Sequence, residues 1–270
     1  MLKSVWLQEN KWEDVENYLK KKKTIIVPFG SVEQHGKHLP LGTDAFVAQK
    51  LAEDAGKLTH TLVAPPAWFG WAPHHMAYPG TVTLRPETLT VLVEDICQSL
   101  IYHGFEKIII INGHREANLP PIKIASARLR NKTGAFIPIV DPFYFHFKEG
   151  KKLRKSPPGG IGHAEELESS HMYYLYPDLC SPENAFDNIP DQPSFMIFDP
   201  FVEEDRVLTS SDTATYLEHT KNIGVAGAST QASKETGEKY HKTFIEKLAE
   251  FIRYCEEEVK VQLRNVEIPL

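Results

Sequence analysis

Three side chains with metal-binding chemistry follow the first apolar run of the chain. Residues 24–27 (Thr-Ile-Ile-Val) are typical of a buried strand, and Glu33, His35 and Asp44 come shortly after it. Carboxylate oxygens and imidazole nitrogens are ligands that divalent metal ions accept in proteins. In open α/β sheets, ligands bind at the carboxyl ends of the strands. The spacing therefore predicts that this loop holds half of a metal site.

Two further groups of such side chains occur later in the sequence. His114 and Glu116 follow a second apolar run, and His163 and Glu168 stand at the start of a predicted helix. Because parallel strand ends meet along one sheet edge, the first two groups can lie side by side. Gly36 and the glycine before His114 allow the tight bends that would direct ligands to one point. Each group alone is also compatible with a hydrogen-bonded loop histidine or a helix start stabilised by its dipole.

Asp44 has a second interpretation from sequence alone. It directly precedes an apolar pattern of helical spacing, and an aspartate there is a common N-cap of a helix. Capping the helix and binding metal do not exclude each other, so both interpretations stay open at this point.

The elements that must position these groups alternate between strand and helix. The run of four isoleucines before Asn112 indicates a strand buried on both faces, as in parallel sheets covered by helices. Alternating strands and helices predict an α/β fold, a three-layer α/β/α sandwich with a mostly parallel central sheet, in a single domain over 1–270. The predicted strands are 24–29, 61–64, 81–84, 107–111, 135–140 and 224–228. The predicted helices are 12–22, 44–58, 86–103, 121–132, 162–175 and 233–261.

Two segments have no clear periodicity. Residues 141–160 are aromatic, basic and rich in Pro and Gly, which favours a loop or lid, and the region 177–212 is left unassigned. The segment 68–78 contains Trp68, Trp71, His74 and His75, and it forms either one wall of a pocket or part of the core or a subunit contact.

Composition excludes several classes of function. The chain has 270 residues, 41% of them hydrophobic and 24% charged, and a formal net charge of −6. It offers no basic stripe for nucleic acid and no apolar run of the roughly 20 residues needed to cross a membrane. The three cysteines are far apart, which fits a reducing compartment. We expect a cytoplasmic protein with a small-molecule substrate and with neither nucleic acid nor membrane as partner.

Several motifs together resemble the creatininase family of metal-dependent amidohydrolases. The matching segments occur in the family's order and are 28–36 (Pro-Phe-Gly-Ser-Val-Glu-Gln-His-Gly), 38–44, His75 with 78–84, 112–114 (Asn-Gly-His), 163–170 and 224–227. The first of these is highly specific. The resemblance implies an α/β/α fold, a centre of two divalent ions (Zn, Mn or Fe) and a homo-oligomer, often a hexamer. By motif, the implied metal ligands are Glu33, His35, Asp44, His114 and Glu168, with Asp44 bridging the ions, and His163 is the implied catalytic histidine.

The chain departs from the family pattern around two motifs. Many members have Gly-Gly-Asn after the Asn-Gly-His motif, whereas Arg115, Glu116 and Ala117 follow here. Creatininase itself has a Glu two residues after this His, so we expect Glu116 to act as a labile ligand or a proton relay. Glu165 stands where most members carry Gly, which would crowd or recharge the pocket. These departures concern the substrate more than the metals.

The implied chemistry is hydrolysis by a hydroxide shared between two ions. That hydroxide would attack a carbonyl carbon, and His163 would protonate the leaving nitrogen of a small amide, lactam or formamide. One alternative is cleavage of a C–C bond in a cyclic ketone of the cyclitol type. Another is a metal-binding protein without turnover, against which the presence of His163 argues. Arg154 and the lysines within 141–155 would favour an anionic or polyhydroxylated substrate if that segment closes over the site.

Overall fold

The core of the fold is a four-stranded parallel sheet. A computed structural model describes residues 3–191, 195–202, 207, 209–210 and 212–269. The strands are β1 (Thr24–Phe29), β2 (Leu62–Val63), β3 (Lys107–Asn112) and β4 (Ile139–Val140), in the order β2-β1-β3-β4. β1 and β3 pair along their whole length, from Thr24 opposite Lys107 to Phe29 opposite Asn112. Both strands therefore end at the same level of the sheet.

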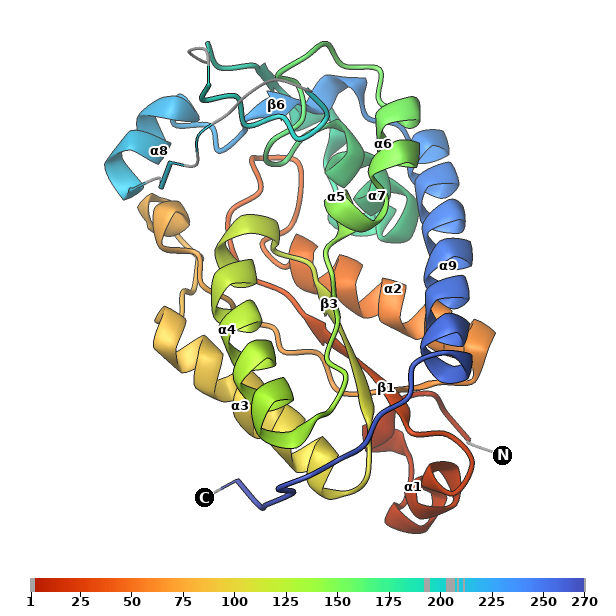
Figure 1. Ribbon diagram of the computed structural model, residues 1–270. Coiled ribbons are helices and arrows are strands. Elements are labelled where there is room, and N and C mark those ends of the chain that lie inside the picture. The colour runs from red at the N-terminus through yellow and green to blue at the C-terminus, as the bar shows by residue number, and fades with distance from the viewer. Residues whose placement is uncertain (1–2, 192–194, 203–206, 208, 211, 270) are drawn as a thin grey trace.

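Helices cover both faces of this sheet (Figure 1). On one face lie α2 (Thr43–Thr59), α7 (Glu166–Leu175) and α9 (Lys234–Glu257). On the other lie α3 (Pro86–Tyr102) and α4 (Arg115–Thr133), with the short α1 (Trp12–Leu19) near the amino end. The expected three-layer α/β/α sandwich with a mostly parallel sheet is confirmed.

Alternate side chains of the central strands supply two separate cores. Ile26, Ile109 and Ile111 belong to the core beneath α2 and α9, whereas Ile25 and Ile108 belong to the core beneath α3 and α4. Successive side chains of a strand point to opposite faces, so an unbroken apolar run is what a sheet covered on both sides requires.

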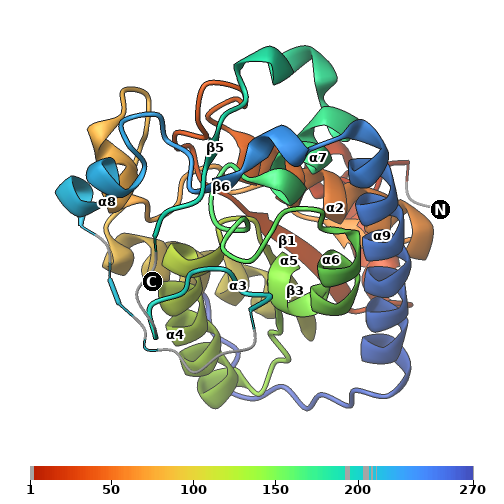
Figure 2. The same ribbon diagram turned by 90° about the horizontal axis from the view of Figure 1, so that it is seen from above.

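Smaller elements gather above the carboxyl ends of β1 and β3. They are α5 (Pro142–Phe145), α6 (Phe147–Leu153), α8 (Thr213–His219) and an antiparallel pair of β5 (Asp187–Asn188) with β6 (Gly227–Ala228). Seen from above, the ends of the two strands lie between α8 on one side and α7 and α9 on the other (Figure 2). The 3-10 helices are η1 (Leu7–Glu9), η2 (Pro73–Ala77), η3 (Pro177–Leu179), η4 (Pro182–Asn184) and η5 (Ser229–Gln231).

Several sequence-based assignments differ from the structure. The predicted strand 81–84 makes only isolated bridges, Val82 to Val32 and Thr83 to Gly70, because its neighbours are loops and not sheet strands. The composition of 141–160 favours a loop or lid, but the first part of the segment is helical and forms α5 and α6. α4 begins at Arg115, ahead of the predicted start at 121, although two prolines lie inside it. Part of the unassigned region 177–212 lies outside the described residues.

Within the described part of the chain, no helix is both long and apolar enough to cross a membrane.

Candidate metal centre

The predicted ligands converge where the strand order changes direction. In the sheet, β2 lies on one side of β1 and β3 lies on the other. The chain runs from β1 to β2 and then crosses to β3, so the strand order reverses its direction between β1 and β3. Crevices at such switch points, outside the carboxyl ends of the strands, are the usual ligand sites of α/β folds. The loop after β1 carries Glu33 and His35, and the end of β3 leads into His114.

Asp44 lies at the centre of the cluster, in the first turn of α2. Its Oδ1 lies 3.2 Å from Nε2 of His35, and its Oδ2 lies 3.2 Å from Nδ1 of His114. The two oxygens of one carboxylate thus face two different imidazoles. The helix begins at Thr43, and the N-cap position belongs to Gly42, which makes no side-chain cap hydrogen bond. The N-cap interpretation of Asp44 is therefore wrong.

A glycine allows the start of α2 to approach β3 this closely. A Cβ atom at Gly113 would lie 2.2 Å from the backbone oxygen of Asp44, a separation too short for any side chain at this position. The glycine next to His114 is thus needed to bring the Asp44 and His114 side chains together.

The cluster contains overlapping groups of three potential ligands. In each group, one ligand atom per residue lies within 4.8 Å of the others. The first group is Glu33, Asp44 and His114, and the second is His35, Asp44 and Glu168. A third group joins Glu33 and His35 to His163. All five predicted metal ligands therefore lie together, and Asp44 belongs to the first two groups.

The donor atoms fit a divalent ion. Among the described residues, both carboxylate oxygens of Glu33, Oδ2 of Asp44 and Nε2 of His35 are buried without a well-directed hydrogen bond, and their polar neighbours at 3.1–3.2 Å are other side chains of the cluster. Nδ1 of His35 lies 3.1 Å from the backbone oxygen of Glu33, to which it can donate, so in the neutral ring Nε2 carries the lone pair that a metal ion would use. Anchoring one ring nitrogen to an oxygen acceptor is how proteins commonly orient a metal-binding histidine.

The charges of the cluster lead to the same conclusion. Burial raises the pKa of Glu33. For His114, burial alone would lower the pKa, but the carboxylates of Glu33 and Asp44 together outweigh it and raise the pKa to about 10. Burial would lower the pKa of His35, but the carboxylates of Asp44 and Glu168 together reverse the effect and raise the pKa well above its usual value. Without a cation, the buried carboxylates thus retain protons on the imidazoles. A bound divalent ion would supply that positive charge directly.

His163 presents one ring nitrogen to this cluster. Its Nε2 lies 2.8 Å from the backbone oxygen of Gln34, which can only accept, so Nε2 carries the hydrogen. Its Nδ1 is then unprotonated and lies 3.9 Å from Oε1 of Glu33. Burial, followed by the charge of His35, lowers the pKa of His163 to about 3. His163 is therefore neutral, and its unprotonated Nδ1 lies on the side that faces the carboxylates.

Two side chains in the cluster were not among the predicted site residues. His75 in η2 is 1% exposed, and its Nε2 lies 3.1 Å from Oε1 of Glu33. The amide nitrogen of Gln34 lies 2.9 Å from Nδ1 of His75 and 3.0 Å from Nε2 of His163, while its amide oxygen accepts from the backbone of Gly36. Both residues stand in the motifs that carry the family resemblance, which was the available signal for them.

Comparison with known proteins identifies the family. The model of the creatininase family, described as creatinine amidohydrolase, matches residues 8–252. The chain belongs to the creatininase family. It is 31% identical to 3-dehydro-scyllo-inosose hydrolase of Thermotoga maritima over 69% of this chain and 61% of that relative. It is 26% identical to creatinine amidohydrolase of Pseudomonas putida over 94% of this chain and 98% of that enzyme.

Solved creatininase structures have the same fold. A manganese creatininase superposes with a TM-score of 0.77 at 25% identity, covering 94% of this chain and all of that chain. A variant creatininase of the Zn-Zn type superposes with a TM-score of 0.76 at 25% identity, covering 95% of this chain and all of that chain. One of these creatininases is thus described with manganese and the other with zinc, and this chain has clustered groups able to hold a metal.

The two departures from the creatininase pattern lie in different surroundings. Glu116, predicted as a labile ligand or proton relay, has a 60% exposed side chain, pairs with Arg115 at 3.3 Å and belongs to none of the ligand groups. Its role stays a prediction. The buried Glu165 accepts hydrogen bonds from the backbone nitrogens of Leu167 and Glu168, which makes it the N-cap of α7.

The segment around 68–78 contributes both to the core and to the site. Trp71 packs against the core beneath α3 and α4, and Trp68 contacts Phe46 edge-on at 5.2 Å between ring centroids. The ring of His74 lies 6.2 Å from that of His114. The tryptophans thus support the loop, while the two histidines form the wall of the site.

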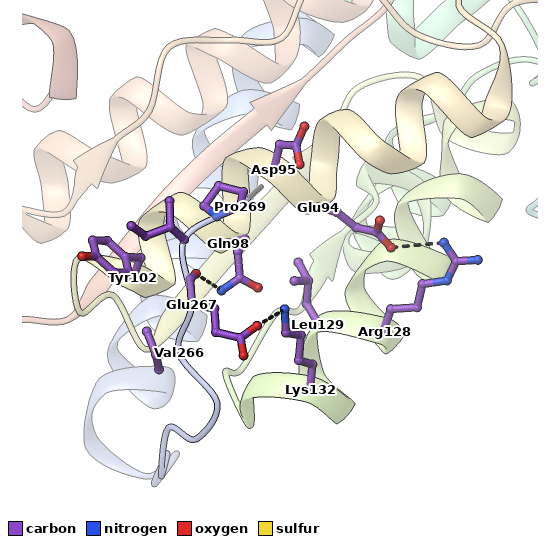
Figure 3. Close-up of a pocket in the computed structure, with 11 residues that line it drawn as sticks. Glu94, Asp95, Gln98, Tyr102, Arg128, Leu129, Lys132, Val266, Glu267 and Pro269 are labelled. Carbon is purple, nitrogen blue, oxygen red and sulfur yellow. Dashed lines mark hydrogen bonds and ion pairs between the residues drawn. The ribbon is translucent and has the colours of Figure 1, made fainter.

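A separate hollow lies at the other end of the sheet, between α3, α4 and the C-terminal segment (Figure 3). Four of its charged side chains form two pairs: Arg128 with Glu94 at 3.2 Å and Lys132 with Glu267 at 2.9 Å. Among its described side chains, Oε1 of Gln98 is the one polar atom that is buried without a hydrogen-bond partner, whereas several such atoms converge at the metal centre. We therefore assign the chemistry to the cluster.

Proposed function

We propose that the protein is a metal-dependent hydrolase that cleaves a C–N bond, in an amide, lactam or formamide, of a small molecule. The observation that supports this most strongly is the position of Asp44, whose two oxygens face two ligand groups. That arrangement suits two divalent ions with Asp44 between them. When bound, such ions lower the pKa of a water molecule toward neutrality and polarise a carbonyl group.

The proposed ligands follow from the two groups. Glu33 and His114 would hold one ion and His35 and Glu168 the other, with Asp44 shared. Zinc, manganese and iron are the candidate ions; relatives of this chain include zinc and manganese creatininases.

His163 would move the proton that hydrolysis requires. Water adds to the carbonyl carbon, the C–N bond breaks, and the nitrogen leaves with a proton. A neutral His163 can accept a proton at Nδ1 from the attacking water and return it to the leaving nitrogen. The backbone oxygen of Gln34 accepts a hydrogen bond from Nε2, and this bond holds the ring with Nδ1 facing the carboxylates. Such general acid–base catalysis contributes about 10²–10⁴-fold in rate.

Cleavage of a C–C bond in a cyclic ketone is the second candidate. The 31% identity to an inosose hydrolase, higher than that to creatinine amidohydrolase, favours it. The same addition of water to a carbonyl would occur, and the leaving carbon would take the proton.

Metal analysis followed by a substrate panel tests these proposals. We expect two ions per chain after reconstitution, and turnover of creatinine, a formamidopyrimidine or a short peptide, or alternatively of a cyclitol ketone. Fewer than one tightly bound ion per chain would refute the two-ion centre. Full metal occupancy without turnover of any compound would favour a metal-binding protein without catalysis.

The homo-oligomer implied by the family resemblance is also a proposal. Light scattering on the purified protein measures it, and a monomer would contradict it.

A further inference from the structure

Tyr216 in α8 has a buried hydroxyl group that no described protein group pairs with. The side chain is 8% exposed, and its oxygen has no hydrogen-bond partner among the described residues. The ring lies edge-on against those of His74, at 4.9 Å, and His75, at 4.6 Å, and its centroid is 6.1 Å from that of His163. An unpaired buried hydroxyl costs free energy, so its presence calls for a specific reason.

The surroundings of this hydroxyl are those of the metal centre. Burial, and then the carboxylates of Glu33 and Glu168, raise the pKa of Tyr216 well above its usual value. Asp44 contributes in the same direction. The hydroxyl is therefore within electrostatic reach of the carboxylates of both ligand groups, although α8 is more than forty residues beyond Glu168 in the chain.

Hydrogen bonds at both ends of α8 hold the tyrosine in this position. At its start, Oγ1 of Thr213 donates to the backbone oxygen of Pro73, 3.0 Å away. Just beyond its end, the hydroxyls of Thr220 and Tyr78 lie 2.6 Å apart. Pro73 is the first residue of η2, the 3-10 helix that carries His74 and His75, and Tyr78 directly follows it. Figure 2 shows α8 beside this segment. The placement of Tyr216 is thus built into the packing of two elements.

We propose that Tyr216 is a catalytic residue that donates a hydrogen bond to the carbonyl oxygen of the substrate, the atom that gains negative charge when water adds. This inference rests on the proposed hydrolysis of a carbonyl compound. A tyrosine hydroxyl, with an ordinary pKa of about 10, keeps its proton at neutral pH and can donate it. A donor aimed at an oxygen that becomes anionic stabilises the transition state more than the substrate. The substrate oxygen would also be the hydrogen-bond acceptor that the Tyr216 hydroxyl lacks among the described residues.

The variant Tyr216→Phe tests this directly, because it removes the hydroxyl and keeps the ring that packs on His75. The matched control is Tyr173→Phe. Tyr173 in α7 is also 8% exposed, and its hydroxyl has no hydrogen-bond partner among the described residues. Burial, and then Cys180 and Glu183 in place of the ligand carboxylates, raise the pKa of Tyr173 to about 12. Metal content and thermal midpoint should match the wild type in both variants.

On whichever panel compound the wild type turns over, we expect Tyr216→Phe to lower kcat about 10²–10³-fold with KM within about 3-fold. A kcat within about 3-fold of the wild type, an effect on KM alone, or loss of metal in Tyr216→Phe would overturn the assignment. An equal loss in Tyr173→Phe would also overturn it, because the effect would then not be specific to this position.

Binding of inorganic phosphate separates this inference from the proposed function. Phosphate is a tetrahedral oxyanion, and calorimetry of the metal-loaded protein measures its affinity without turnover. We expect Tyr216→Phe to weaken phosphate binding about 10-fold or more, as for loss of a hydrogen bond to a charged group. If the wild type hydrolyses no panel compound but this difference is found, the hydrolase proposal fails and the donor assignment stands. If turnover is found but neither kcat nor phosphate affinity depends on Tyr216, the donor assignment fails alone.

Discussion

Replacing Asp44 by asparagine tests whether one side chain serves both ligand groups. Asparagine keeps the size and shape of the side chain but removes its charge and one of its two oxygens. Asp44 is 2% exposed, and each of its oxygens lies 3.2 Å from a different imidazole. We expect Asp44→Asn to lose both ions. His114→Ala, which removes a member of the first group only, should lose one.

The loss of metal affinity depends on the number of ions that lose a ligand in each variant. Loss of a partner outside the ligand sphere typically weakens metal affinity about 10–100-fold, which sets a lower bound for loss of a direct ligand. In Asp44→Asn this factor applies twice, so the product of the two association constants should fall by at least about 10²–10⁴-fold. In His114→Ala it applies once.

Metal content after dialysis against a metal buffer, followed by competition titration with a chelator, measures both quantities. Asp95→Asn, the same chemical change on the exposed side of α3, is the control and should retain two ions. The thermal midpoint of each metal-free variant checks that the fold is intact. If Asp44→Asn retains one ion at wild-type affinity, Asp44 serves a single ion and the shared-ligand argument is wrong.

Three further predictions concern side chains around the centre. His163→Ala should keep both ions and lose about 10²–10⁴-fold in kcat; loss of metal would instead make His163 a ligand. Gln34→Leu removes the amide whose nitrogen can donate to Nδ1 of His75, so kcat should fall about 10–100-fold at unchanged metal content, and an unchanged kcat would show that the amide does not orient this ring. Burial, and then the charge of His35, lowers the pKa of His38 to about 4, so this ring is neutral in the folded protein and takes up a proton near pH 6.5 when unfolded. Because the unfolded chain binds this proton more readily, the free energy of unfolding falls as the pH drops from about 6.5 toward 4, by about 3 kcal/mol over the whole window and by about 2 kcal/mol between pH 7 and 4.5. His38→Gln should remove that part of the pH dependence in denaturant titrations at pH 7 and 4.5.

The parts of the fold that the sequence predicted well are those with strong local patterns. The isoleucine run of β3 and the apolar residues of β1 could only be strands buried on both faces, and polar ligands after each of them indicated the functional edge. The start of α4 was not predicted, because prolines inside a helix normally indicate its beginning. Here Pro120 and Pro121 lie inside the helix.

The parts of the site that local patterns missed depend on tertiary packing. Nothing in the spacing of His75 or Tyr216 shows that their rings meet, since the contact depends on hydrogen bonds between η2 and α8. Likewise, the aromatic residues of 141–160 suggested a loop. In the structure Phe145 packs on Phe244 of α9 at 5.5 Å between ring centroids, and that contact supports the helical conformation.

The two ligand groups become available at different stages of chain synthesis. Glu33, Asp44 and His114 all precede α4, so the first group is complete once β1, α2 and β3 have come together. The second group needs Glu168, which arrives only with α7, more than fifty residues later. An ion held by the first group would join the two central strands and α2 while the rest of the chain is still being made. The same ion would already fix Asp44 in the position in which α7 later meets it.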